Sequence, residues 1–131
     1  MSFLDGLLGG GSAKVATYPF TLRATSTAET SSDEIGVCQF NADDWPEHTI
    51  TFFANLEVAA EGQTATLELY NVFDGVTVAT LTSTSTVTEK RTTEITLPAL
   101  DKLYGVRLRR TGGDPTKRVA CRSAGFELRE G

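Results

Sequence analysis

The residues best suited to chemistry gather in one short segment around His48, the only histidine in the chain. Glu47 adjoins it, and Asp43 and Asp44 precede it closely. An imidazole beside carboxylates can serve acid–base catalysis, and carboxylate oxygens are ligands that calcium prefers. However, one histidine with loop carboxylates specifies no catalytic geometry, and the spacing is not that of an EF-hand loop. We therefore interpret His48 as a surface histidine at the start of a strand and expect no bound metal or cofactor.

Other catalytic signatures are missing from the sequence. It contains no GxSxG, HExxH, P-loop or GxGxxG motif. Its two cysteines, Cys38 and Cys121, lack the CxxC spacing of zinc sites. In a reducing cytosol we expect two buried free thiols, whereas a secreted chain would join them in a disulfide. The sequence thus predicts a protein that is not an enzyme.

Trp45, the only tryptophan, lies in the same polar segment and allows two interpretations. On an exposed loop the ring offers a stacking platform for a sugar, as in carbohydrate-binding modules. Alternatively, the ring caps one end of the fold while Pro46 fixes the turn, and we favour this interpretation. Sugar sites gather several aromatic rings, whereas Tyr18, Tyr70 and Tyr104 fall within strand patterns and are expected in the core or in an interface.

Charge is unevenly distributed along this chain of net charge -5. Residues 24–89 contain many carboxylates and no lysine or arginine, whereas basic residues are frequent after residue 101. This polarity would create complementary patches between copies, unless strands of the two regions pair and interleave their charges. Arg107, Arg109 and Arg110 form the densest basic group. Because the acidic total disfavours nucleic-acid binding, we interpret them as a candidate charged interface with a neighbouring subunit.

The elements that must position these residues are strands. Threonine and β-branched residues dominate, helical periodicity is nearly absent, and turn residues recur at short intervals. The clearest alternation places five apolar side chains on one face of a half-buried strand: Ile50, Phe52, Ala54, Leu56 and Val58. Further strands are expected over residues 15–24, 35–40, 65–73, 76–88 (ending in a loop), 92–97, 104–109 and 119–128.

These predicted strands define the expected architecture. Asp74-Gly75 marks a tight hairpin, and residues 41–48 form a loop. The connections are too short for helical crossovers, so about eight strands must pair antiparallel. An all-β, antiparallel two-sheet β-sandwich fits best, with a jelly roll as the preferred topology.

The first fourteen residues differ in character from the rest. Phe3, Leu4, Leu7 and Leu8 form an apolar tip, which three consecutive glycines follow. Such glycines behave as a flexible tether, so the tip stays in water unless another surface covers it. We therefore divide the chain into an N-terminal apolar arm with a glycine hinge (residues 1–14) and a β-sandwich domain (residues 15–131). The arm indicates assembly with a neighbour.

Length and hydropathy limit the class of protein to which the chain can belong. Its 131 residues suit one domain, and 40% hydrophobic residues suffice for a core without disulfides. No apolar run approaches the roughly 20 residues of a membrane span. The N-terminal segment lacks the basic start and the cleavage site of a signal peptide. We expect cytoplasmic synthesis and no contact with membranes.

Four short motifs in the last two thirds of the chain form a pattern. They are Leu69-Tyr70-Asn71, Asp74-Gly75, the strand from Tyr104 to Arg109, and the final strand from Ser123 to Leu128. With them, the sequence from Thr49 to Arg129 resembles small β-sandwich modules of tailed bacteriophage virions. Such modules occur in capsid decoration or cement proteins and in tail or fibre subunits. The N-terminal third has no counterpart in this pattern.

This resemblance implies a non-enzymatic virion structural protein, above all a capsid decoration or cement subunit made in the host cytoplasm. It would form a homo-oligomer and contact the major capsid protein or tail subunits, with the arm buried against a neighbour. A tail or fibre subunit is one alternative. Another is a carbohydrate-binding module for host attachment, in which Trp45 stacks on sugar rings. A third is a secreted or surface sandwich with a Cys38–Cys121 disulfide.

Overall fold

The computed structural model describes residues 15–21, 24–26 and 33–130. The predicted arm, residues 1–14, lies outside these ranges. The described elements are β1 (Val15–Thr21), β2 (Ala24–Ser26), β3 (Asp33–Asn41), the 3-10 turn η1 (Ala42–Asp44), β4 (His48–Glu57), β5 (Thr64–Asn71), β6 (Val76–Ser83), β7 (Glu89–Ile95), β8 (Asp101–Thr111) and β9 (Val119–Glu130). In this part of the chain no helix is long and apolar enough to cross a membrane.

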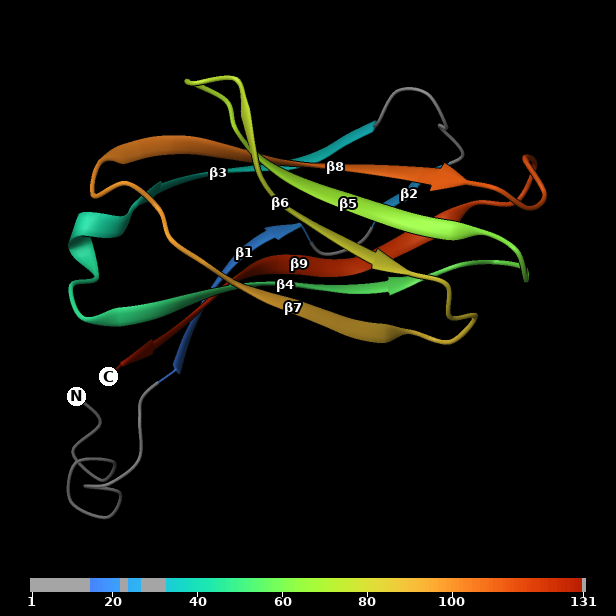
Figure 1. Cartoon of the computed structure of the whole chain (residues 1–131), viewed down its shortest axis with the longest axis horizontal. Coiled ribbons are helices and arrows are strands. Elements are labelled where there is room, and N and C mark those ends of the chain that lie inside the picture. Colours follow the sequence, from blue (N-terminus) through green and yellow to red (C-terminus); the bar gives the residue numbers. More distant parts are fainter. Residues whose placement is uncertain (1–14, 22–23, 27–32, 131) are drawn as a thin grey trace, which may run out of the picture.

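Two antiparallel sheets face each other in a sandwich (Figure 1). One sheet has the order β1-β9-β4-β7, with β2 also paired to β9, and the other has the order β3-β8-β5-β6. From β3 onward, every connection except the β5–β6 hairpin passes from one sheet to the other. This strand order is that of a jelly roll built from two Greek keys. The predicted all-β, antiparallel two-sheet architecture is therefore confirmed.

The first predicted strand is divided into two. β1 pairs with residues 124–129 of β9, and β2 pairs with residues 119–121. The register shifts between Pro19 and Thr21, because proline has no amide hydrogen to donate to the ladder. Gly125 lies opposite this irregularity, and a Cβ there would collide with the Tyr18 carbonyl oxygen. Glycine thus permits the close approach of β1 to β9.

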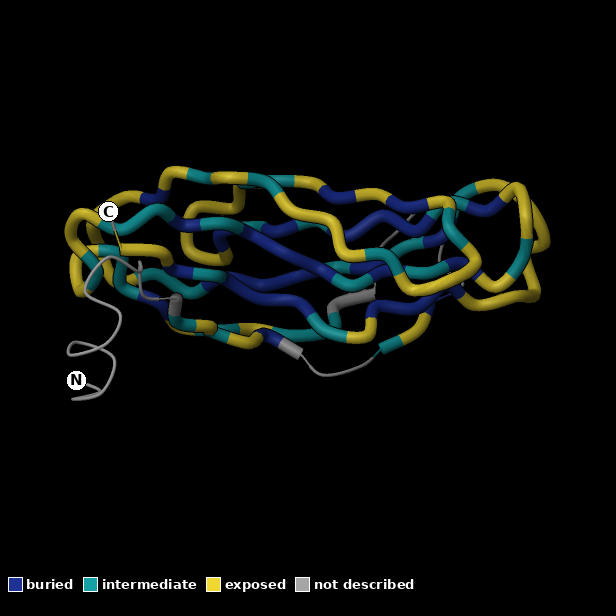
Figure 2. The backbone as a smooth tube through the Cα atoms, turned by 90° about the horizontal axis from the view of Figure 1, so that it is seen from below, coloured by how far each residue is buried: buried dark blue, intermediate teal, exposed yellow. Residues whose placement is uncertain are grey.

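The core lies between the sheets and follows the predicted alternation. The five predicted apolar side chains, four on β4 and Val58 immediately after it, are between 0% and 7% exposed, and on β8 Tyr104, Val106 and Leu108 are fully buried. Phe126 of β9 lies among three other rings, with centroid distances of 4.8 Å to Phe20 and 4.9 Å to Phe40. Figure 2 shows the buried segments running along the middle of both layers.

Two local features differ from the simple pattern. Phe53 lies on the outer face of β4 but is only 7% exposed, and the Lys90 ammonium lies 5.3 Å from its ring centroid. The predicted loop after β3 contains the turn η1, which begins where the Asn41 side chain accepts a hydrogen bond from the Asp43 amide at 3.0 Å. This cap holds the segment that carries Trp45 and His48.

Candidate functional site

The connections between strands gather at the two ends of the sandwich (Figure 1). We call one the Trp45 end, made of residues 42–47, 72–75 and 96–100. We call the other the Gln63 end, made of residues 58–63, 84–88 and 112–118. Most residues singled out for chemistry lie at the Trp45 end.

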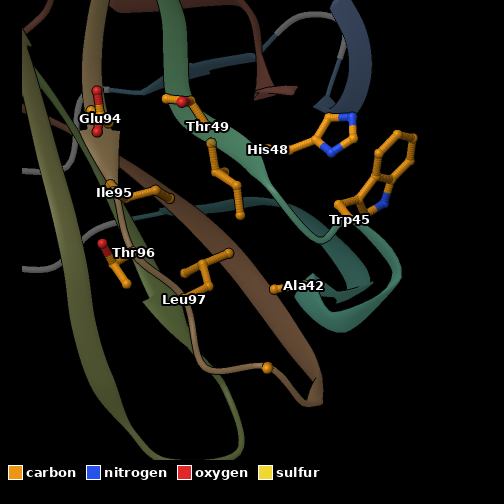
Figure 3. A pocket seen from close by; sticks show the side chains of 10 residues that line it. Ala42, Trp45, His48, Thr49, Glu94, Ile95, Thr96 and Leu97 are labelled. Carbon is orange, nitrogen blue, oxygen red and sulfur yellow. The ribbon is translucent and has the colours of Figure 1, made fainter. Parts of the chain in front are cut away.

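A hollow of about 270 Å³ lies at the Trp45 end, between η1 and the start of β4 on one side and the end of β7 on the other (Figure 3). Its apolar lining consists of Ala42, Trp45, Ile50, Ile95, Leu97 and Ala99. Its polar lining consists of His48, Thr49, Glu94 and Thr96. Ile50 and Ile95 are register partners on β4 and β7, so the ladder itself places these two side chains together.

Trp45 is half-buried and packs edge-on against two other rings. Its centroid lies 5.6 Å from that of Tyr18 and 5.3 Å from that of His48, with interplanar angles of 89° and 82°. T-shaped contacts of this kind add to the stability gained from burial alone. The ring thus contacts β1 and β4, two strands of the same sheet, while one part of it lines the hollow.

The geometry of His48 is set by its own turn. Its Nδ1 lies 2.9 Å from the carbonyl oxygen of Pro46, which can only accept, so Nδ1 is the donor in this contact. Asp43, Asp44 and Glu47 are exposed. Among the described residues, no three histidine, cysteine or acidic side chains gather as metal ligands would. Of these three carboxylates, Glu47 lines a hollow together with His48.

A second hollow adjoins the first. It is lined by Pro46, Glu47, His48 and Glu130, so His48 belongs to both. His48 is the register partner of Glu130, and Val15 is the partner of Arg129. The first described residue of the chain therefore enters the domain beside these hollows. The predicted arm residues Phe3, Leu4, Leu7 and Leu8 lie outside the described residues, but the segment that carries them joins the sandwich at the Trp45 end.

Arg107, one of the predicted interface residues, lies on the outer face of β8 and packs against β5. Its guanidinium carbon is 4.2 Å from the Tyr70 ring centroid, and its Nε is 4.0 Å from a carboxylate oxygen of Glu68. The Tyr70 ring in turn covers Gly105, where an added Cβ would come within 2.5 Å of the ring. A cation on the face of a tyrosine is favourable even when partly exposed.

The other two arginines lie on opposite faces of β8. Arg109 is half-buried on the same strand face as Arg107, two residues along β8. Arg110 points the other way, is only 4% exposed, and donates a hydrogen bond to the Gly112 carbonyl oxygen at 2.7 Å. The structure thus brings Arg107 and Arg109 to one surface and commits Arg110 to the Gln63 end.

The acidic and basic regions of the sequence mix on the surface. Ion pairs link Asp74 with Lys102 at 3.2 Å and Glu57 with Arg122 at 2.7 Å. Each joins a carboxylate from residues 24–89 to a cation from the basic region. Of the two interpretations of the charge pattern, the structure supports interleaving by strand pairing. Exposed pairs of this kind add little stability singly.

Both cysteines are free thiols in the structure, but only one of them is fully buried, whereas the sequence predicted burial of both. Cys38 lies half-buried on β3, and Cys121 lies fully buried on β9 in the opposite sheet. Burial raises the pKa of the Cys121 thiol to about 12 and raises the pKa of Cys38 in the same direction. A thiol with a raised pKa is a poor nucleophile near neutral pH, so neither cysteine is prepared for catalysis.

The sequence analysis missed an exposed apolar group at the Trp45 end. At the tip of the β5–β6 hairpin, Phe73 is 61% and Val76 52% exposed, and Leu100 on the neighbouring connection is 58% exposed. The Lys102 ammonium lies 5.9 Å from the Phe73 ring centroid. The available signal was a large apolar residue immediately before the Asp74-Gly75 turn, a position that a hairpin exposes.

Comparisons with known proteins identify a fold. No family model and no curated protein matches the chain. Among solved structures, it is similar to VP2 of infectious bursal disease virus in a subviral particle, with a TM-score of 0.56 and 12% identity over 92% of this chain and 33% of that one. It is also similar to a structure of T=1 particles derived from the same virus, with a TM-score of 0.55 and 11% identity over 92% of this chain and 32% of that one.

The chain therefore spans about a third of the VP2 chains that it matches. At 11 to 12% identity this likeness establishes a shared sandwich fold, in agreement with the strand order. Function must be argued from the surfaces of this chain.

Proposed function

We propose that the chain is a non-enzymatic structural subunit of a virion, and more specifically a capsid decoration or cement protein of a tailed bacteriophage. The observation that carries this proposal is the jelly roll itself: nearly the whole chain, 92%, is similar to one third of a protein that forms viral particles. The motifs around Tyr70, Asp74 and residues 104–109 support the phage setting by resemblance.

The surface of the domain suits assembly. The Trp45 end exposes Phe73, Val76 and Leu100, and contiguous exposed apolar patches mark contact surfaces. Arg107 and Arg109 provide cations on a separate, strand-built face. Aromatic residues and arginine are the side chains most enriched in protein interfaces, whereas lysine and glutamate are depleted there.

The arm supplies a second kind of contact in this proposal. Phe3, Leu4, Leu7 and Leu8 would bury apolar area against a neighbouring subunit, which contributes several kcal/mol before ordering costs at roughly 25 cal/mol per Å². Repetition of such a contact on a lattice would add avidity. The partners in this proposal are the major capsid protein, or tail subunits if the chain belongs to the tail, together with copies of the chain itself.

The test is co-sedimentation with particles. Lysates of cells that produce the chain naturally are treated with nuclease and separated on a density gradient, and the chain is followed with an antibody. We expect it to peak with the nuclease-resistant particles, in a constant ratio to their most abundant protein. A chain that stays entirely in the soluble fraction while particles form without it would overturn the proposal. Gradients of heads separated from tails then distinguish the two locations.

A carbohydrate-binding role is a second candidate, because Trp45 lines a hollow that also presents Glu94 and Thr96. To test this role, binding to a glycan array is compared between the unmodified chain and the Trp45→Ala variant. Specific binding that disappears in the variant would favour this role. An array with no signal for the unmodified chain would remove it.

A further inference from the structure

The hollow at the Trp45 end has a mixed lining, in which apolar residues outnumber polar ones. Six of its lining residues are apolar, and they come from η1, β4 and the end of β7. Figure 3 shows Trp45 and His48 on one side and Ile95 and Leu97 on the other. Leu97 is 8% and Ile50 7% exposed, so the hollow is an opening into the core itself.

The volume of this hollow fits single side chains, whereas the adjoining hollow at His48 is larger, at about 670 Å³. An apolar cavity of about 150 Å³ accommodates a benzene ring, so about 270 Å³ accommodates one aromatic ring or two branched aliphatic side chains. Sites for drug-sized ligands run from roughly 300 to 1,000 Å³, which places this hollow below their range. The arm offers the matching groups in Phe3, Leu4, Leu7 and Leu8.

The position of Val15 brings the arm within reach. Val15 pairs with Arg129, and the next residue of β9, Glu130, pairs with His48, which lines the hollow. β1 and β4 are both neighbours of β9, so they are separated by about 10 Å. The seven residue steps from Leu8 to Val15 extend to about 23 Å at ~3.3 Å each, and they include the three glycines.

We propose that the apolar tip of the chain's own arm docks in this hollow and packs against Trp45, Ile95 and Leu97. A short flexible tether gives the tip an effective concentration in the mM range at its own hollow, far above that of any second copy in dilute solution. Docking also removes from water one or two of the four apolar side chains of the tip. The contact covers the tip while the chain is free, whatever the chain later assembles with.

Trp45 reports on the hollow directly because it is the only tryptophan. The experiment compares the full-length chain with a full-length variant in which Phe3, Leu4, Leu7 and Leu8 are all replaced by serine. Acrylamide quenching of Trp45 emission is measured over a hundredfold range of protein concentration, with the mass followed by light scattering. Val87→Ser, an exposed apolar site at the Gln63 end, is the matched control, and circular dichroism verifies that each variant is folded.

We expect the quenching constant to rise about twofold in the four-serine variant and to stay unchanged in Val87→Ser, since a tip at mM effective concentration is docked most of the time. In the unmodified monomer the quenching constant should not depend on protein concentration. Equal quenching in the four-serine variant and the unmodified chain would overturn the proposal. Protection that appears only as the mass increases would also overturn it, because the occupant would then be the arm of a second copy.

Discussion

The two ends of the sandwich are closed in different ways. At the Gln63 end, Gln63 is fully buried and makes four hydrogen bonds. Its Oε1 accepts from the amides of Ala59 and Ala60, and its Nε2 donates to the carbonyl oxygens of Asp114 and Lys117, all at 2.9 to 3.0 Å. One side chain thereby ties two loops that lie more than fifty residues apart in the sequence.

The Trp45 end is held by ring contacts instead. Tyr18, Trp45 and His48 meet edge-on, a hollow remains beside them, and Phe73 and Leu100 are exposed. A hydrogen-bonded end has its polar groups satisfied and offers few of them to a partner. An end built from partly covered apolar groups gains free energy when something else covers it. From this contrast we propose that the Gln63 end contributes mainly stability and the Trp45 end mainly binding.

The largest expected effect on stability comes from a substitution at the Gln63 end. Gln63→Leu keeps a similar volume but leaves two amides and two carbonyl groups without their partner, so we expect unfolding free energy to fall by about 3 kcal/mol. Urea denaturation followed by circular dichroism measures this. The control is Gln39→Leu, which removes one exposed hydrogen bond to Asp101 and should cost less than about 0.5 kcal/mol. Equal losses in the two variants would break the contrast between the ends.

Removal of the ring at the Trp45 end should have the next largest effect. Trp45→Ala deletes a half-buried side chain and its contacts with Tyr18 and His48, so we expect a loss of about 2 kcal/mol in the same assay. A loss below that of Gln39→Leu would show that the ring holds nothing together. In that case the interpretation of Trp45 as a cap would fail.

The pH dependence of the unfolding free energy tests the burial of the two thiols. The buried Cys121 has a pKa of about 12 when folded, whereas an unfolded thiol ionises near pH ~8.5. Between these values the unfolded chain releases a proton that the folded chain keeps, so stability falls as pH rises, by at most about 1.4 kcal/mol per unit. Urea midpoints from pH 8 to 11 should therefore decline less steeply in Cys121→Ala than in the unmodified chain.

Cys38 provides the internal control for this measurement. It is half-buried on β3, three residues before the strand reaches the Trp45 end, and burial raises its pKa in the same direction. Because its thiol is more accessible, Cys38→Ala should change the pH slope less, and thiol reagents at pH 8 should modify Cys38 before Cys121. Faster modification of Cys121 would contradict the assigned burial.

The smallest expected effect on stability belongs to Phe73. Its side chain is 61% exposed at the hairpin tip, so Phe73→Ser should change the unfolding free energy by less than about 0.5 kcal/mol. If the Trp45 end is the contact surface, the same variant should nevertheless co-sediment with particles at a reduced ratio. A normal ratio, together with normal stability, would remove Phe73 from the interface.

Local alternation and turn chemistry account for what the sequence predicted. The pattern of β4 places Phe52 and Leu56 in the core, and Asp74-Gly75 forms the expected turn, in which Gly75 adopts a φ of 68°. Alternation along β8 also explains why Arg110, which was predicted to share one interface with Arg107 and Arg109, is buried on the other face of the strand. Such features depend on a period of two residues and on glycine's conformational freedom, so they need no tertiary information.

The remaining features depend on pairing between distant strands. The hollow exists because β7 pairs with β4, which places Ile95 beside Ile50, and nothing in either segment alone identifies the other. Gln63 is a polar residue in an ordinary turn sequence, and its role appears only once residues 114–117 lie above it. Residue types were enough to predict the segment around Trp45 and His48. The strands that pack against this segment could be identified only from the fold.

Electron cryomicroscopy of particles that contain the chain would test the contrast between the two ends most directly. We expect the jelly roll to lie against a neighbouring subunit through the Trp45 end, with Phe73 and the loop around Trp45 in the interface and the Gln63 end facing solvent. Attachment through the Gln63 end, with the Trp45 end free, would contradict the assignment of binding to the Trp45 end.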